Sequence, residues 1–210
     1  MIASWGARAV ARRLFVCAVL ASAALVAQTG WATHIKPEPP FTGLKPAKPR
    51  ESKLKPGLAV TYYLNRFNDT AELLLEAEIT KGDKGKPLPQ LNYKSGRGTV
   101  LTSNREDMVG AMIRGFIKFS KKGTYTLLLN SNDGVILTIA GRKLYEDPTV
   151  HSDDMSPPIK LEIGETGWYS LEIAYFEKKN TATLELFWQE PGGAGDAVPV
   201  PAQAFAHIPE

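Results

Sequence analysis

Residues 167–188 read GWYSLEIAYFEKKNTATLELFW, which is two runs of alternating polar and apolar residues around a short polar turn. One face of each run is apolar throughout, and its residues are Tyr169, Leu171, Ile173 and Tyr175, then Ala182, Leu184, Leu186 and Trp188. Successive side chains of a strand point to opposite faces, so this period of two indicates two half-buried β-strands. The polar residues between them predict a hairpin.

The same alternation appears elsewhere in the chain, in TYTLLL (residues 124–129) and in IKLEI (residues 159–163). The segments between such runs carry turn residues, for example KKG before Thr124 and GETG before Trp168. Many short strands at regular spacing predict an all-β fold, an antiparallel β-sandwich or barrel in one domain. Residues 69–79, DTAELLLEAEI, fit either a strand or a short helix.

The N-terminal part of the chain has a different character. Three arginines precede the apolar run LFVCAVLASAALVA (residues 14–27), and GWA follows at residues 30–32, so we interpret residues 1–32 as an export signal peptide. Residues 33–56 are rich in Pro and Lys and predict a flexible linker, either a spacer or a tether to an anionic surface. The predicted β-domain is then residues 57–210, with no transmembrane segment once the signal is removed.

Charge and composition exclude several classes of function. Without residues 1–32, which hold three Arg and no acid, the chain has 22 basic and 22 acidic residues, so its net charge does not predict nucleic-acid binding. The one cysteine, Cys17, lies in the predicted signal, so the exported chain has no thiol nucleophile. It also has no Gly-x-Ser-x-Gly and no His-Glu-x-x-His motif, and we expect no enzymatic activity.

Several motifs along residues 57–206 resemble the PA-fourteen domain family, named after a domain of anthrax protective antigen. They are Gly115-Phe116, Gly123-Thr124-Tyr125-Thr126-Leu127, Ser131-Asn132-Asp133-Gly134, Gly141, Gly167-Trp168-Tyr169, Tyr175-Phe176-Glu177 and Leu186-Phe187-Trp188-Gln189-Glu190-Pro191. The resemblance implies a compact antiparallel β-barrel or sandwich. It covers nearly all of the chain after the linker and leaves no room for a separate catalytic domain.

The resemblance also implies where a ligand would bind. In family members that bind glycans, two adjacent aspartates hold a calcium ion that takes vicinal hydroxyls of the sugar, and a second loop adds an asparagine. Here the two aspartate positions fall on Asn132 and Asp133, so one acid is replaced by an amide. The second-loop position falls near Glu177, whose carboxylate could restore the lost charge. The alternative is that Asn132-Asp133-Gly134 is only a structural turn.

Three further residues are candidates for ligand contact. Asp153 and Asp154, in the segment HSDDMSPP, could line the same mouth together with Asp147, although an acidic loop is also a common way to keep a surface soluble. Trp168 lies on the opposite face from Tyr169 and Leu171, so it is a candidate for stacking on a sugar. We expect Trp188 to be part of the core, because it belongs to an alternating apolar set.

The sequence thus predicts an exported, non-catalytic binding module, periplasmic or at the cell surface, that recognises a glycan or polysaccharide with calcium as a candidate cofactor. The alternative is an envelope protein that docks a protein partner without binding glycans.

Overall fold

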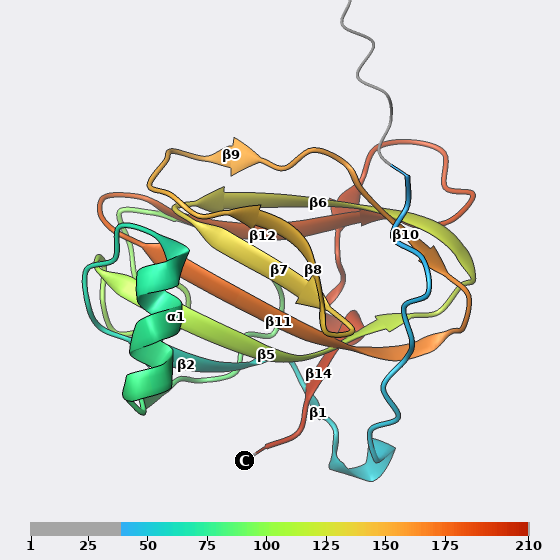
Figure 1. Ribbon diagram of the computed structural model, residues 1–210, viewed down its shortest axis with the longest axis horizontal. Helices are drawn as coiled ribbons and strands as arrows, with labels where there is room; N and C mark the ends of the chain where they lie inside the picture. Colours follow the sequence, from blue (N-terminus) through green and yellow to red (C-terminus); the bar gives the residue numbers. More distant parts are fainter. Residues whose placement is uncertain (1–38, 210) are drawn as a thin grey trace, which may run out of the picture. The chain divides into compact units, whose positions relative to one another are not determined.

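The computed structural model describes residues 39–209, and the predicted signal peptide lies outside them. Fourteen strands within this range form two antiparallel sheets (Figure 1). The eight-stranded sheet contains β1 (Lys55–Pro56), β14 (Phe205–His207), β5 (Val109–Phe119), β11 (Gly167–Glu177), β7 (Val135–Ile139), β8 (Arg142–Asp147), β2 (Ala59–Tyr63) and β3 (Asp83–Lys84). The six-stranded sheet contains β10 (Ile159–Ile163), β6 (Gly123–Asn132), β12 (Ala182–Gln189), β13 (Val198–Pro199), β4 (Asn92–Gly96) and β9 (Asp154–Met155).

The core lies between the two sheets and confirms the alternation seen in the sequence. Tyr169, Leu171, Ile173 and Tyr175 on β11 are fully buried, and the apolar residues of β12 face them from the other sheet. Trp188 is 6% exposed and packs beside Tyr125 with ring centroids 5.5 Å apart, so the prediction that it is a core residue is confirmed. The fold is the predicted antiparallel β-sandwich, because each sheet buries its main apolar face against the other.

The ambiguous segment at residues 69–79 is a helix, α1 (Thr70–Ile79). Asp69 caps it, since its side chain accepts a hydrogen bond from the backbone N–H of Glu72 at 2.9 Å. The carboxylate of Glu72 in turn accepts from the backbone N–H of Asn68 at 2.7 Å, a reciprocal arrangement that favours the helical start. The helix covers the outer face of the eight-stranded sheet, where Leu73 packs with Phe176 in a second apolar cluster.

Residues 39–56, expected to be part of a flexible linker, lie against the β-sandwich instead. The backbone N–H of Phe41 donates to the carbonyl of Lys160 at 2.8 Å, and the Phe41 carbonyl accepts from the N–H of Glu162 at 2.9 Å, so Phe41 pairs with the edge strand β10 in a parallel bridge. Leu44 is 7% exposed and belongs to the main core. The packed body therefore begins before residue 57, because two apolar side chains and an unpaired strand edge hold a Pro- and Lys-rich segment in place. Two short 3-10 helices, Glu51–Lys53 and Ala202–Ala204, complete the described structure.

Candidate functional site

A corner at the end of β6 connects the two sheets. After Asn132 the chain leaves the six-stranded sheet through a cis peptide bond to Asp133 and enters β7 of the other sheet at Val135. The corner is fixed to the end of β11, because the backbone N–H of Asp133 donates to the carbonyl of Phe176 at 3.0 Å. The hydroxyl of Tyr175 donates to the carbonyl of Asn132 at 2.6 Å.

Asp133 ties this corner to two loops. Its residue is 3% exposed, and its two carboxylate oxygens accept separate backbone N–H groups, from His151 at 3.0 Å and from Lys178 at 2.8 Å. Burial raises the pKa of Asp133, although both hydrogen bonds oppose the shift. The side chain thus satisfies backbone donors of neighbouring loops rather than its own turn.

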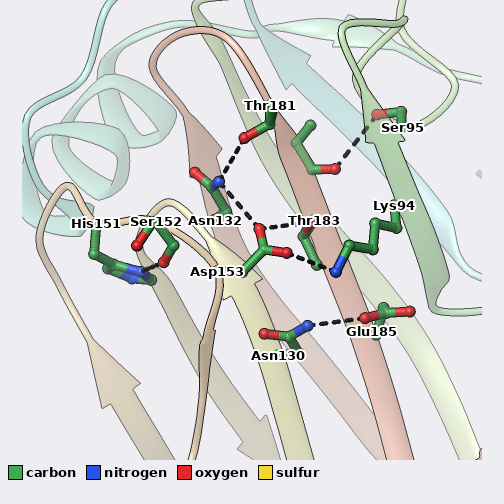
Figure 2. A network of polar contacts seen from close by, with 11 residues as sticks. Lys94, Ser95, Asn130, Asn132, His151, Ser152, Asp153, Thr181, Thr183 and Glu185 are labelled. Carbon is green, nitrogen blue, oxygen red and sulfur yellow. Dashed lines mark hydrogen bonds and ion pairs between the residues drawn. The ribbon is translucent and has the colours of Figure 1, made fainter.

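The side chain of Asn132 belongs to a row that crosses three strands. In the six-stranded sheet, Thr183 on β12 pairs with Asn132 on β6 and, on its other side, with Lys94 on β4. Residues directly opposite one another in an antiparallel pair lie on the same face, so these three side chains share one face of the sheet. Figure 2 shows them converging on Asp153, which precedes β9.

Asp153 is the centre of this network. Its Oδ1 accepts from the Asn132 amide at 3.1 Å and from the Thr183 hydroxyl at 2.9 Å, and its Oδ2 lies 2.8 Å from the Lys94 ammonium (Figure 2). Burial would raise the pKa of the Asp153 carboxyl, but the contacts with Lys94, Asn132 and Thr183 outweigh it and lower the pKa. The side chain remains 33% exposed, so this charged group is accessible to a ligand.

A shallow pocket of about 290 Å³ opens over the row. The residues that line it are Lys94, Gly96, Asn132, Ser152, Asp153, Thr181 and Thr183. The Asn132 amide also donates to the Thr181 hydroxyl at 2.8 Å, which holds the β11–β12 loop against the pocket. The Asp153 carboxylate, the Lys94 ammonium and Thr181 are exposed at the pocket, whereas the Asn132 amide and the Thr183 hydroxyl are buried behind them and hold the carboxylate in place.

Glu177 is the last residue of β11, directly after the Phe176 carbonyl that holds the corner, and it is fully buried. Its Oε2 accepts from the backbone N–H of Met108 at 3.1 Å, while Oε1 has no hydrogen-bond partner among the described residues. Burial, followed by the nearby charges of Asp107 and Asp133, raises the pKa of Glu177 to about 8. At neutral pH this side chain is therefore mainly protonated and carries little charge.

The comparisons with known proteins bear on this arrangement. The sequence profile of the PA14 domain matches residues 54–200. The chain belongs to the PA14 domain family. No curated protein sequence gives a significant match to it.

Solved structures share the fold of this PA14 domain at low sequence identity. The PA14 domain of the antifreeze protein MpAFP is 15% identical with a TM-score of 0.61, over 79% of this chain and 96% of that one. The PA14 sugar-binding domain from an RTX adhesin is 18% identical with a TM-score of 0.54, over 72% and 98%. The epithelial adhesin 9 A domain from Candida glabrata, solved in complex with Galβ1-4GlcNAc, is 7% identical with a TM-score of 0.61, over 80% and 96%.

The predicted metal ligands of the PA14 domain are neighbours, but they face different partners. The Asn132 amide directs its N–H groups to Asp153 and Thr181, and since a carboxylate only accepts, this sets the orientation of the amide. Both oxygens of Asp133 are engaged by backbone donors, and Glu177 is buried.

Within residues 39–209 no group of three or more His, Cys, Asp and Glu side chains is placed to hold a metal ion. Calcium takes six to eight oxygen ligands, and the Asn132, Asp133 and Glu177 side chains have their polar atoms directed to other partners or buried. The donor set therefore does not fit calcium well. Calcium binding at these three residues stays a prediction.

The structure separates the predicted ligand-contact residues of the PA14 domain. Asp153 lines the pocket, whereas Asp154 is exposed on β9 and is not among the lining residues. Asp147 is also outside the pocket and lies 3.4 Å from the ring of His151. Trp168 is at the other end of β11 from Glu177, nine residues or about 30 Å away, where Lys118 lies over its ring at 5.4 Å.

Sequence reasoning missed Lys94, Ser152, Thr181 and Thr183. One signal was present for Thr183, because the alternation of β12 places it on the face opposite the core. The structure adds that Thr183 is only 1% exposed, so another segment covers it. Nothing in the local sequence around Lys94 sets it apart from the other lysines of the chain, since its place in the site comes from pairing of β4 with β12.

Proposed function

We propose that this PA14 domain is an exported, non-catalytic module that binds carbohydrate in the pocket over Asn132, Asp153, Thr181 and Thr183. The observation that carries the proposal is the row itself. A partly exposed carboxylate, two hydroxyls, an amide and an ammonium converge on one face, and such groups can both donate to and accept from sugar hydroxyls. Two solved structures with the same fold are described as sugar-binding or contain a bound disaccharide, which supports this choice of ligand.

The geometry gives each residue a role in this proposal. The carboxylate of Asp153 accepts from sugar hydroxyls, and the Asn132 and Thr183 side chains hold it in position with bonds of 3.1 and 2.9 Å. Thr181, on the β11–β12 loop, closes the pocket on one side. A pocket that is already ordered loses little conformational entropy when it binds, which favours affinity.

A glycan array that includes Galβ1-4GlcNAc tests the proposal, with calorimetry on any glycan that binds. We expect Asp153→Asn and Thr183→Val to lose binding by about tenfold or more, because each removes a hydrogen bond or charge at the pocket. Trp168→Ala, at the opposite end of β11 from the corner and outside the pocket lining, is the matched control and should bind like the wild type. Absence of binding to every glycan on the array, with and without calcium, would overturn the proposal.

Export is part of the proposal and has its own test. The first 32 residues have the composition of a signal peptide, and across residues 39–209 no helix is both long and apolar enough to cross a membrane. N-terminal sequencing of the protein recovered from the periplasm or medium should begin after Ala32. Recovery of the intact chain from the cytoplasm would contradict export.

A second candidate function is docking of an envelope protein, and helix α1 favours it. Leu75 and Ile79 are 58% and 69% exposed and lie one turn apart on the same side of the helix. Exposed apolar side chains that adjoin one another often mark an interaction surface. Pull-down from envelope extract with the wild type and with Leu75→Glu/Ile79→Glu would separate the two functions. Partners captured equally by both proteins would contradict docking through α1.

A further inference from the structure

Among the described residues that line the pocket, Lys94 is the one cation. Its ammonium lies 2.8 Å from Oδ2 of Asp153, on the side of the carboxylate away from the bonds to Asn132 and Thr183 (Figure 2). The pairing of Lys94 with Thr183 on neighbouring strands fixes the backbone of Lys94 in the sheet, and its 62% exposed side chain reaches Asp153 from there. The strand pairing and the ion pair with Asp153 together keep a positive charge on this face of the sheet.

The charges of the pocket balance without any added ion. Within residues 39–209, Asp153 is the one acid that lines the pocket and Lys94 the one base, while the position before Asp133 in the corner is the amide Asn132. Glu185, one row further along β12, does not line the pocket; its carboxylate accepts from the Asn130 amide at 2.9 Å and acts on the Lys94 ammonium in the same direction as Asp153 does. A divalent cation at Asp153 would lie beside an ammonium and be repelled by it, so the net charge that attracts calcium to a cluster of carboxylates is missing here.

We propose that Lys94 provides the positive charge of this site, so that the pocket binds a neutral vicinal diol of a sugar without a metal ion. The ion pair with Asp153 uses one of the three N–H donors of an ammonium, and each carboxylate oxygen can accept more than one hydrogen bond. One sugar hydroxyl accepts from Lys94 and the adjacent hydroxyl donates to Asp153. The sugar part of this inference rests on the proposed function, whereas the charge part does not.

Calcium titration by calorimetry tests the charge part without any sugar. We expect no saturable heat from the wild type and saturable calcium binding from Lys94→Met/Asn132→Asp, which removes the cation and restores an acid. Adding Asp153→Asn to that variant should abolish the binding. Saturable calcium binding by the wild type, or none by the double variant, would overturn the inference.

Glycan binding with calcium and with EDTA tests the sugar part, with Galβ1-4GlcNAc and the other glycans of the array as probes. We expect equal binding of the wild type in both conditions and a loss of about tenfold or more in Lys94→Met. The matched control is Lys45→Met, which removes another exposed lysine paired with a carboxylate, that of Glu165 at 3.0 Å. Both lysine variants should unfold at the wild-type temperature, because exposed ion pairs contribute little to stability.

The outcomes separate the two proposals. Binding that EDTA abolishes would overturn the metal-free site and leave carbohydrate binding in place. No glycan binding in either condition would overturn the proposed function, and the calcium titration would still decide whether Lys94 takes the place of a metal ion.

Discussion

Asn132 and Asp133 are consecutive in the chain, yet their side chains have no partner in common. The Asn132 amide donates to Asp153 and Thr181 in the pocket, whereas the Asp133 carboxylate accepts from the backbone of His151 and Lys178. One residue of the pair therefore lines the pocket, and the other holds the loops that surround it. This division of roles leads to different expectations for the two positions.

Asp133→Asn should destabilise the protein. An asparagine has one acceptor oxygen where the aspartate has two, so either the His151 or the Lys178 N–H would face an amide N–H in a buried place. We expect the free energy of unfolding to fall by about 1–3 kcal/mol, measured by urea denaturation. Asp154→Asn, at an exposed position on β9, is the control and should change it little. If Asp133→Asn unfolds at the same urea concentration as the wild type, the Asp133 carboxylate does not stabilise the two loops.

Because Glu177 is buried, we expect the free energy of unfolding to fall as pH rises. Its pKa is raised from 4.5 to about 8 in the folded protein, so folding favours the protonated form. Its contribution is fully present below pH 4.5 and is lost as pH rises through about 8. Glu177→Gln should remove this pH dependence and raise the free energy of unfolding above pH 8, on the order of 1–3 kcal/mol.

Urea denaturation of Glu177→Gln between pH 5 and about 9 measures this effect. Glu172→Gln, an exposed position on the same strand, is the control and should keep the wild-type profile. Parallel profiles for the wild type and Glu177→Gln would contradict a raised pKa at Glu177.

Gly134 is required by space rather than by a positive φ, which its backbone does not adopt. A Cβ at this position would lie 2.5 Å from Cε1 of Phe176 and 2.9 Å from the carbonyl oxygen of Pro148. Gly134→Ala should therefore cost about 1–3 kcal/mol of stability, seen as a lower thermal midpoint. Gly164→Ala, where a Cβ would meet nothing within 4 Å, should not lower it, and equal midpoints for the two variants would contradict the close packing.

Leu44 tests whether residues 39–56 are part of the folded body. It is 7% exposed within the main core, so Leu44→Ala should cost about 2–4 kcal/mol in the free energy of unfolding. A residue of a flexible linker could be truncated at no cost. Lys48→Ala, on the same segment, is the control, and equal stability of the two variants would restore the sequence-based boundary at residue 57.

The sequence by itself determined the strands, the sandwich and the corner. The apolar faces of β11 and β12 could be written down before the structure, because side chains alternate along a strand and a sheet must bury its apolar face. The motif around Asn132 and Asp133 predicted a turn, with a ligand site as the alternative, and the structure showed that the chain changes sheets there.

Only the tertiary structure decided the site. Lys94, Asn132, Asp153 and Thr183 come from four segments and meet because β4, β12 and β6 pair in one particular register. A shift of one residue in that register would send a side chain to the other face, and no local pattern fixes it. The sequence also could not show that Phe41 and Leu44 would attach a Pro- and Lys-rich segment to the sandwich, since that attachment depends on an open strand edge and a space in the core that exist only after folding.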